Sequence, residues 1–255
     1  MGQPADDAEG RKLLTAVERI LASSASIRAT VEGVQATVKS ANDGLKGTEL
    51  RDAVAQALVK HYSDRAAIAG GASALPGLIP GWGSLVAAVG GTFAELTLLL
   101  KWEVEMALAL SHLYGFDIDQ PTERQLAFLM ASVGTYDAGG RNFFADVARL
   151  EGTALWNYAP RHLARLLAQA VAAVAAMYIW RGFLKAIPVL GIGIGAGVNK
   201  VLTGKVGKRC LKDLSTRREL VKSAAKASPA KKPKATKKPK AKKVVRREPP
   251  AQTLN

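Results

Sequence analysis

Three acidic residues, Glu95, Glu103 and Glu105, fall within one stretch of the 255-residue chain that has the apolar spacing of a helix. Two carboxylates acting on one glycosidic bond must lie within about 5 to 9.5 Å of each other. Glu95 and Glu103 are two helical turns apart, and the rise of a helix separates them by about 12 Å. We therefore expect these carboxylates to cap the helix or to pair with a cation, such as Lys101 or Arg124.

Other chemistry finds little support in the residue pattern. The three histidines lie about fifty residues apart and form no HxxxH pair, so they do not indicate a metal site. Cys210 lies in a basic segment and Ser84 lacks a GxSxG context, so both are expected to be structural. The glycine run at 191–200 fits no phosphate-binding pattern. The sequence thus predicts no catalytic residue, cofactor, metal or small-molecule substrate.

Two apolar segments interrupt the helices that would have to position a site. Residues 66–94 carry no charge but contain two prolines and seven glycines, and a second apolar segment covers residues 186–199. Proline removes a backbone donor and glycine permits turn conformations, so we predict two helical hairpins. The glycines of the second segment also stand four residues apart, a spacing that lets helices pack closely in a bilayer or a soluble bundle. The predicted hairpin breaks are Pro76, Gly77, Pro80, Gly81, Pro188, Gly191, Gly193, Gly195 and Gly197.

The rest of the chain before the tail has helical periodicity. Apolar residues recur from Leu13 to Val38 in steps of three and four, which predicts one amphipathic helix, either a coiled-coil arm or a helix packed on the body. Further helices are predicted over residues 48–61, 92–114, 122–133, 143–150 and 161–180. No segment has a convincing strand pattern. We therefore predict an all-α helical bundle with two Gly/Pro-broken apolar hairpins and a disordered basic tail.

The C-terminal tail carries most of the excess charge. The net charge is +15, and residues 221–255 hold twelve Lys and Arg against one Glu. A Lys-, Pro- and Ala-rich sequence cannot bury apolar surface, which predicts disorder. Such a tail could contact an anionic membrane or nucleic acid, or could only aid solubility, and the sequence leaves these open. The predicted contact residues are Lys231, Lys232, Lys234, Lys237, Lys238, Lys240, Lys242 and Lys243.

Domain limits and location follow from these patterns. We predict an amphipathic arm at 1–47, a helical domain at 48–220 and the tail at 221–255. The acidic N-terminus lacks the apolar core of a secretory signal, and a single cysteine fits a reducing compartment. We expect the protein on the cytoplasmic side of a membrane, peripheral or partly inserted. The apolar length permits hairpins that span, dip into the bilayer or stay buried.

Four sequence elements resemble the EcsC-like family and follow in the family's order between about Asp64 and Cys210. They are the apolar segment leading to an acidic residue, the YGFD element, the PTER element and the segment IPVLGIGIGAGVNKVLTGKVGKRC. The resemblance implies a helical, membrane-associated protein, and the family's name links it to accessory proteins of ABC-type transporters. It implies no particular reaction. The family-motif residues are Glu95, Tyr114, Gly115, Asp117 and Asn199.

These patterns predict a non-enzymatic, membrane-associated accessory or scaffold protein. Because the second apolar segment lies just before the Lys-rich C-terminus, we expect apolar surface and positive charge to serve one partner, an anionic membrane surface. A membrane protein is a further expected partner. The alternative is a soluble helical bundle whose tail binds nucleic acid, and a lower alternative is an uncharacterised hydrolase.

Overall fold

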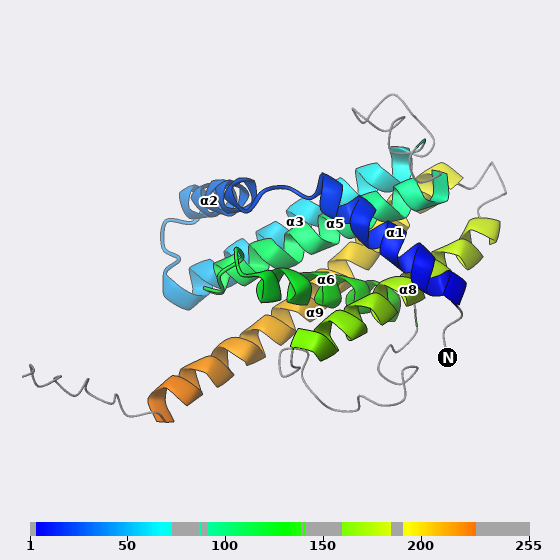
Figure 1. Ribbon diagram of the computed structural model, residues 1–255. Helices are drawn as coiled ribbons and strands as arrows, with labels where there is room; N and C mark the ends of the chain where they lie inside the picture. Colours follow the sequence, from blue (N-terminus) through cyan, green and yellow to red (C-terminus); the bar gives the residue numbers. More distant parts are fainter. Residues whose placement is uncertain are drawn as a thin grey trace, which may run out of the picture.

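The computed structural model describes residues 4–72, 87, 91–138, 140, 160–184 and 191–227. Every regular element in these ranges is a helix, so the all-α prediction is confirmed (Figure 1). The helices are α1 (Pro4–Ile20), α2 (Ser24–Ala41), α3 (Gly47–Ala72), α5 (Gly91–Leu113), α6 (Pro121–Ala138), α8 (Pro160–Leu184) and α9 (Gly191–Ala227).

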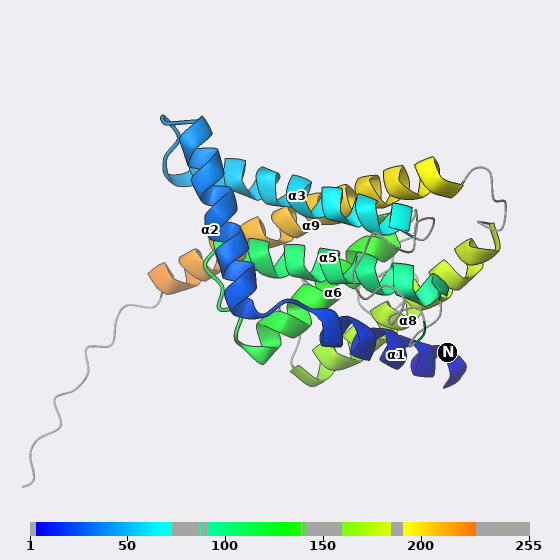
Figure 2. The same cartoon turned by 90° about the horizontal axis from the view of Figure 1, so that it is seen from above.

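α5 is the central helix of the bundle. It contacts each of the other described helices, and its side chains are buried on almost every face. A helix that is apolar all round is expected in such a position, because every face must meet another apolar surface. α3, α6, α8 and α9 surround α5, and the N-terminal helices cover the outside (Figure 2).

The N-terminal segment forms two helices, so the prediction of one helix from Leu13 to Val38 is wrong. α1 ends at Ile20, and the side chain of Ser23 caps α2 by accepting a hydrogen bond from the backbone N–H of Ser26 (3.2 Å). α1 packs on α8, and α2 packs on α3 and α5. The apolar spacing continues through the break because both helices bury one face, each against a different part of the body.

Local signals predict the turn between α5 and α6 correctly. Gly115 has φ +90°, and the N–H of Phe116 donates to the carbonyl of Ser111 (3.0 Å), which is the hydrogen bond of a Schellman motif. The Asp117 side chain then accepts a hydrogen bond from the N–H of Asp119 (3.1 Å). Gly115 thus ends α5, and the following residues lead directly into α6.

α9 is continuous, which corrects part of the predicted second hairpin. Gly193, Gly195 and Gly197 lie inside the first turns of this helix and do not break it. The close contacts of α9 come from two other glycines, Gly207 of α9 and Gly134 of α6, which are not among the predicted break residues. A Cβ atom on Gly207 would lie 2.6 Å from a Val59 methyl group of α3, and one on Gly134 would lie 2.9 Å from Val206.

We expect Gly115→Ala to lower the free energy of unfolding by about 1–2 kcal/mol, because an L-residue is strained at this positive φ. Gly33→Ala is the matched control. Gly33 lies inside α2 with open space around it, so the added methyl group should stabilise the helix by about 0.5–1 kcal/mol. Urea unfolding measures both variants, and equal effects would contradict the assigned turn.

Gly207→Ala should destabilise the protein by about 1–3 kcal/mol, because the stiff Val59 side chain leaves no room for a methyl group. The same change at Gly197, also in α9, meets no atom within 4 Å and should be neutral or mildly stabilising. Thermal unfolding of the two variants provides the comparison. A neutral Gly207→Ala would show that α9 does not pack this closely on α3.

Candidate functional site

Four helix ends meet at one end of the bundle, which we call the apolar end. α3 ends there at Ala72, α5 begins at Gly91, α8 ends at Leu184 and α9 begins at Gly191 (Figures 1 and 2). Both connections that contain predicted hairpin breaks are therefore anchored at the same place. The break residues Pro76, Gly77, Pro80, Gly81 and Pro188 lie outside the described residues, so the hairpins themselves stay a prediction.

Apolar side chains face solvent next to the apolar end. Ile68 is 58% exposed on α3, and Val198 and Val201 are 42% and 58% exposed on α9. The ion pair between Asp64 and Lys200 (2.6 Å) joins the two helices one turn away from Ile68. We call Ile68, Val198 and Val201 the apolar patch. None of the described helices has the length and apolarity needed to cross a bilayer.

The basic tail begins at the opposite end of the bundle. α9 has 37 residues and spans about 55 Å, so its last residue, Ala227, is far from the apolar end (Figure 1). The predicted domain boundary at residue 220 falls inside this helix. The predicted contact residues of the tail, at 231–243, lie outside the described residues. The second apolar segment and the tail are thus close in sequence. In the structure, the length of α9 separates the apolar end from the residue where the tail begins.

The structure brings two family-motif residues together inside the bundle. Asn199 of α9 donates a hydrogen bond from Nδ2 to Oε1 of Glu95 on α5 (3.4 Å), and both side chains are buried. Two turns along α5, Glu103 accepts a hydrogen bond from the Thr203 hydroxyl (3.1 Å) and lies in hydrogen-bond contact with Thr135 of α6. We call these five residues the polar seam. Its signals in the sequence are the acidic residues within the apolar helix α5 and the two polar residues four apart on the buried face of α9.

The hydrogen bonds around Glu103 indicate a neutral carboxyl. The Thr135 hydroxyl is within reach of both Glu103 Oε2 and the carbonyl of Ala131 (2.8 Å), but it has a single proton to donate. A protonated Glu103 that donates to Thr135, which then donates to Ala131, satisfies all of these atoms. Burial acts in the same direction and raises the pKa of Glu103 from 4.5 to about 8.

Glu105 is buried as one partner of an ion pair, as the sequence predicted for this helix. Its Oε1 accepts hydrogen bonds from Lys101 Nζ (2.6 Å) and from the backbone N–H of Ala22 (2.8 Å). Lys101 Nζ also lies 3.5 Å from the centre of the Trp102 ring. Glu105 therefore fixes the junction of α1 and α2 to the central helix.

The remaining family-motif residues lie at the end of the bundle opposite the apolar end. Gly115 and Asp117 form the turn described above, and the Tyr114 ring lies 5.0 Å from the guanidinium carbon of Arg51. Phe116 stacks at 3.9 Å under Arg217 of α9, which also forms a two-point ion pair with Glu123 of α6. These contacts join α3, α6 and α9, so this part of the motif is structural.

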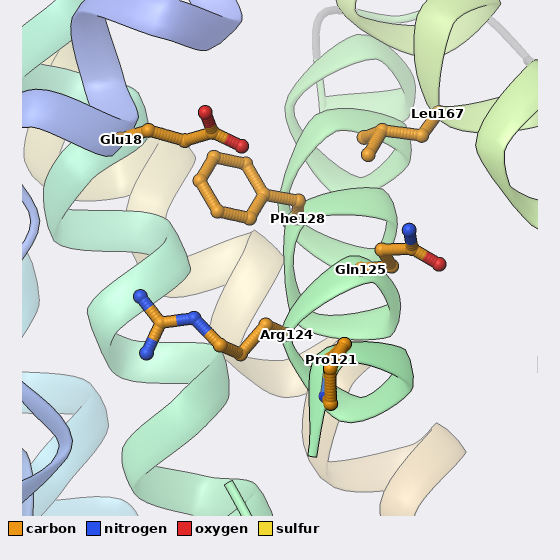
Figure 3. Close-up of a pocket in the computed structure, with 6 residues that line it drawn as sticks. All are labelled: Glu18, Pro121, Arg124, Gln125, Phe128 and Leu167. Carbon is orange, nitrogen blue, oxygen red and sulfur yellow. The ribbon is translucent and has the colours of Figure 1, made fainter. Parts of the chain in front are cut away.

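The described residues contain no group of three or more His, Cys, Asp and Glu side chains that could hold a metal ion. Cys210 is fully buried, and burial raises the pKa of its thiol, so it is poorly suited to be a nucleophile. An open cleft of about 310 Å³ lies between α1, α6 and α8 (Figure 3). Its lining residues are Glu18, Pro121, Arg124, Gln125, Phe128 and Leu167. The cleft presents no nucleophile beside a base.

The model of the EcsC protein family matches residues 11–218. The chain belongs to the EcsC protein family. No curated protein and no solved structure matches it.

The family match extends beyond the predicted resemblance, which began at Asp64. It includes most of α1, all of α2 and the start of α3, so the N-terminal helices are part of the EcsC domain. It ends nine residues before the end of α9 and leaves out the basic tail. The tail is thus a feature of this chain outside its family region.

The raised pKa of Glu103 predicts a pH-dependent stability. The folded state holds a proton that the unfolded chain releases, so the free energy of unfolding should fall as pH rises from about 4.5 to about 8. Glu103→Gln keeps a donor for Thr135 and an acceptor for Thr203, and should remove this slope. Urea unfolding at pH 5, 6.5 and 8 measures the difference.

Glu32→Gln is the control for this measurement, because Glu32 lies on the exposed face of α2. It should keep the slope of the unchanged protein. An unchanged slope in Glu103→Gln would mean that Glu103 is ionised in the folded protein.

Proposed function

We propose that this EcsC protein is a non-enzymatic accessory or scaffold protein that binds the cytoplasmic face of a membrane. Its proposed partner there is an ABC-type transporter. The observation that carries the proposal is that the helices flanking both apolar connections have their ends at one end of the bundle, beside the exposed apolar patch. A contiguous exposed apolar surface is typical of sites that meet a membrane or a protein partner. Two uncharged segments attached at the same end of the bundle favour the membrane.

The contacts of the acidic residues support a role without catalysis. Glu103 is enclosed and kept neutral by burial, with two threonines as hydrogen-bond partners, and Glu105 is paired with Lys101 and a backbone N–H. A general acid or base must reach the proton that it transfers. Both carboxyls are instead used to join helices.

Nucleic-acid binding through the tail is a second candidate. The observation that favours it is the length of α9, which starts the tail about 55 Å from the apolar end and so allows the two to have different partners. Such binding would be strongly salt-dependent and indifferent to base sequence.

Vesicle flotation tests the proposed membrane binding. The full chain and a chain ending at Ala227, where α9 ends, are mixed with vesicles of phosphatidylcholine alone or with phosphatidylserine. We expect both chains to float with the vesicles, since the apolar end is present in both, and the shorter chain to show less preference for phosphatidylserine.

Membranes from cells that express the full chain provide the second readout. The chain should resist a high-salt wash, because apolar contacts are not screened by ions. Failure of both chains to float would contradict the proposal. Flotation of the full chain alone would assign membrane binding to the tail and remove the role of the apolar end.

A further inference from the structure

The exposed face of α9 carries an ordered row of side chains. Val198, Val201, Lys205, Lys208 and Lys212 are all exposed, and their spacing of three and four residues places them along one face of the helix. The row begins in the apolar patch and becomes basic towards the middle of the helix. We call Lys205, Lys208 and Lys212 the lysine stripe.

The lysine stripe has no acidic partner within salt-bridge distance among the described residues. Several acidic side chains of the flanking helices are paired elsewhere. Asp64 of α3 binds Lys60 and Lys200, Asp137 of α6 binds Arg209, and Glu123 of α6 binds Arg217. On α9 itself, Asp213 pairs with Arg209 and Glu219 with Lys222. Asp213 is near enough to Lys212 for a favourable electrostatic interaction, but none of the three lysines forms an ion pair with a described residue, so the stripe presents positive charge to solvent.

We propose that the lysine stripe is a contact surface for anionic phospholipid headgroups, which lays α9 along the membrane. Apolar side chains next to a row of lysines are the composition of a helix that binds at a membrane interface. Each lysine near an anionic leaflet makes its own favourable contribution to the free energy of membrane binding. The inference rests on the proposed membrane binding and adds the lipid class and the orientation.

This orientation explains how the apolar end and the tail can both reach the membrane, although the length of α9 separates them. When the bundle stands on its apolar end, the tail starts far above the surface, at the distal end of α9. When α9 lies along the surface, both the apolar patch and the start of the tail are next to the lipid. The stripe lies between them and connects the two regions.

Charge removal in the full chain tests the role of the stripe. The variant Lys205→Gln/Lys208→Gln/Lys212→Gln is compared with Lys12→Gln/Lys39→Gln/Lys46→Gln, which removes the same charge from exposed positions on α1, α2 and the α2–α3 connection. We expect the stripe variant to bind phosphatidylserine vesicles about ten- to a hundredfold more weakly than the control variant. Equal binding of the two variants would overturn the inference.

Energy transfer to headgroup-labelled lipid tests the orientation independently. A dye is attached at Val201→Cys, Ser215→Cys or Gln35→Cys in the full chain, because the native Cys210 is buried and protected from labelling. Val201 and Ser215 lie about 21 Å apart along α9, and both should show strong transfer if the helix lies flat. Gln35, on the exposed face of α2, is the reference.

The outcomes separate this inference from the proposed function. Strong transfer at Val201 with only reference transfer at Ser215 would mean that the protein stands on its apolar end, which overturns the flat orientation and keeps membrane binding. Loss of duplex DNA binding in the stripe variant, with unchanged vesicle binding, would assign the stripe to nucleic acid and overturn the inference. Absence of vesicle binding by the full chain would remove the proposed function itself.

Discussion

The close approach of α9 to α3 and α5 is the constraint on which the rest of the structure depends. At Gly207 the backbone of α9 comes so near to Val59 and Met106 that no larger residue fits without a shift. This approach brings Asn199 and Thr203 to the carboxyls of α5. Because α5 is surrounded on all sides, its buried carboxyls need partners inside the protein, and Glu95 and Glu103 find theirs on neighbouring helices. A more distant α9 would remove these two hydrogen bonds to the carboxyls of α5.

Two carboxyls on α5 show different solutions to burial. The carboxyl of Glu103 is protonated and neutral, and the hydroxyls of two threonines complete its hydrogen bonds. Glu105 keeps a cation beside it, and that cation also rests on an aromatic ring. An isolated buried charge is far more costly than either arrangement. Each solution also ties α5 to another part of the chain, through α6 and α9 in one case and through the α1–α2 junction in the other.

The sequence predicted what local chemistry determines. The glycine after Tyr114 ended α5 as expected, and the periodicity of the central helix was read correctly, because both depend on neighbours in the chain. The break at Ser23 was missed, since the apolar spacing continued through it. The contacts of the polar seam could not be predicted from the sequence, because the spacing of apolar residues does not show which helix faces Glu103. The contact between α9 and α3 could not be predicted either, because the glycine that touches α3 is not one of the regularly spaced glycines at the start of α9.

The light attachment of α2 has a consequence for the motions of the domain. This helix fully buries only Ile27 and Val31, Val34 and Val38 are partly buried against the core, and an exposed ion pair joins Arg28 to Asp119. Segments with so few buried side chains open locally at a free energy far below that of global unfolding. The amide hydrogens of α2 should therefore exchange with solvent while those of α5 remain protected. The domain thus has one outer helix, α2, that can open locally while the core helices stay folded.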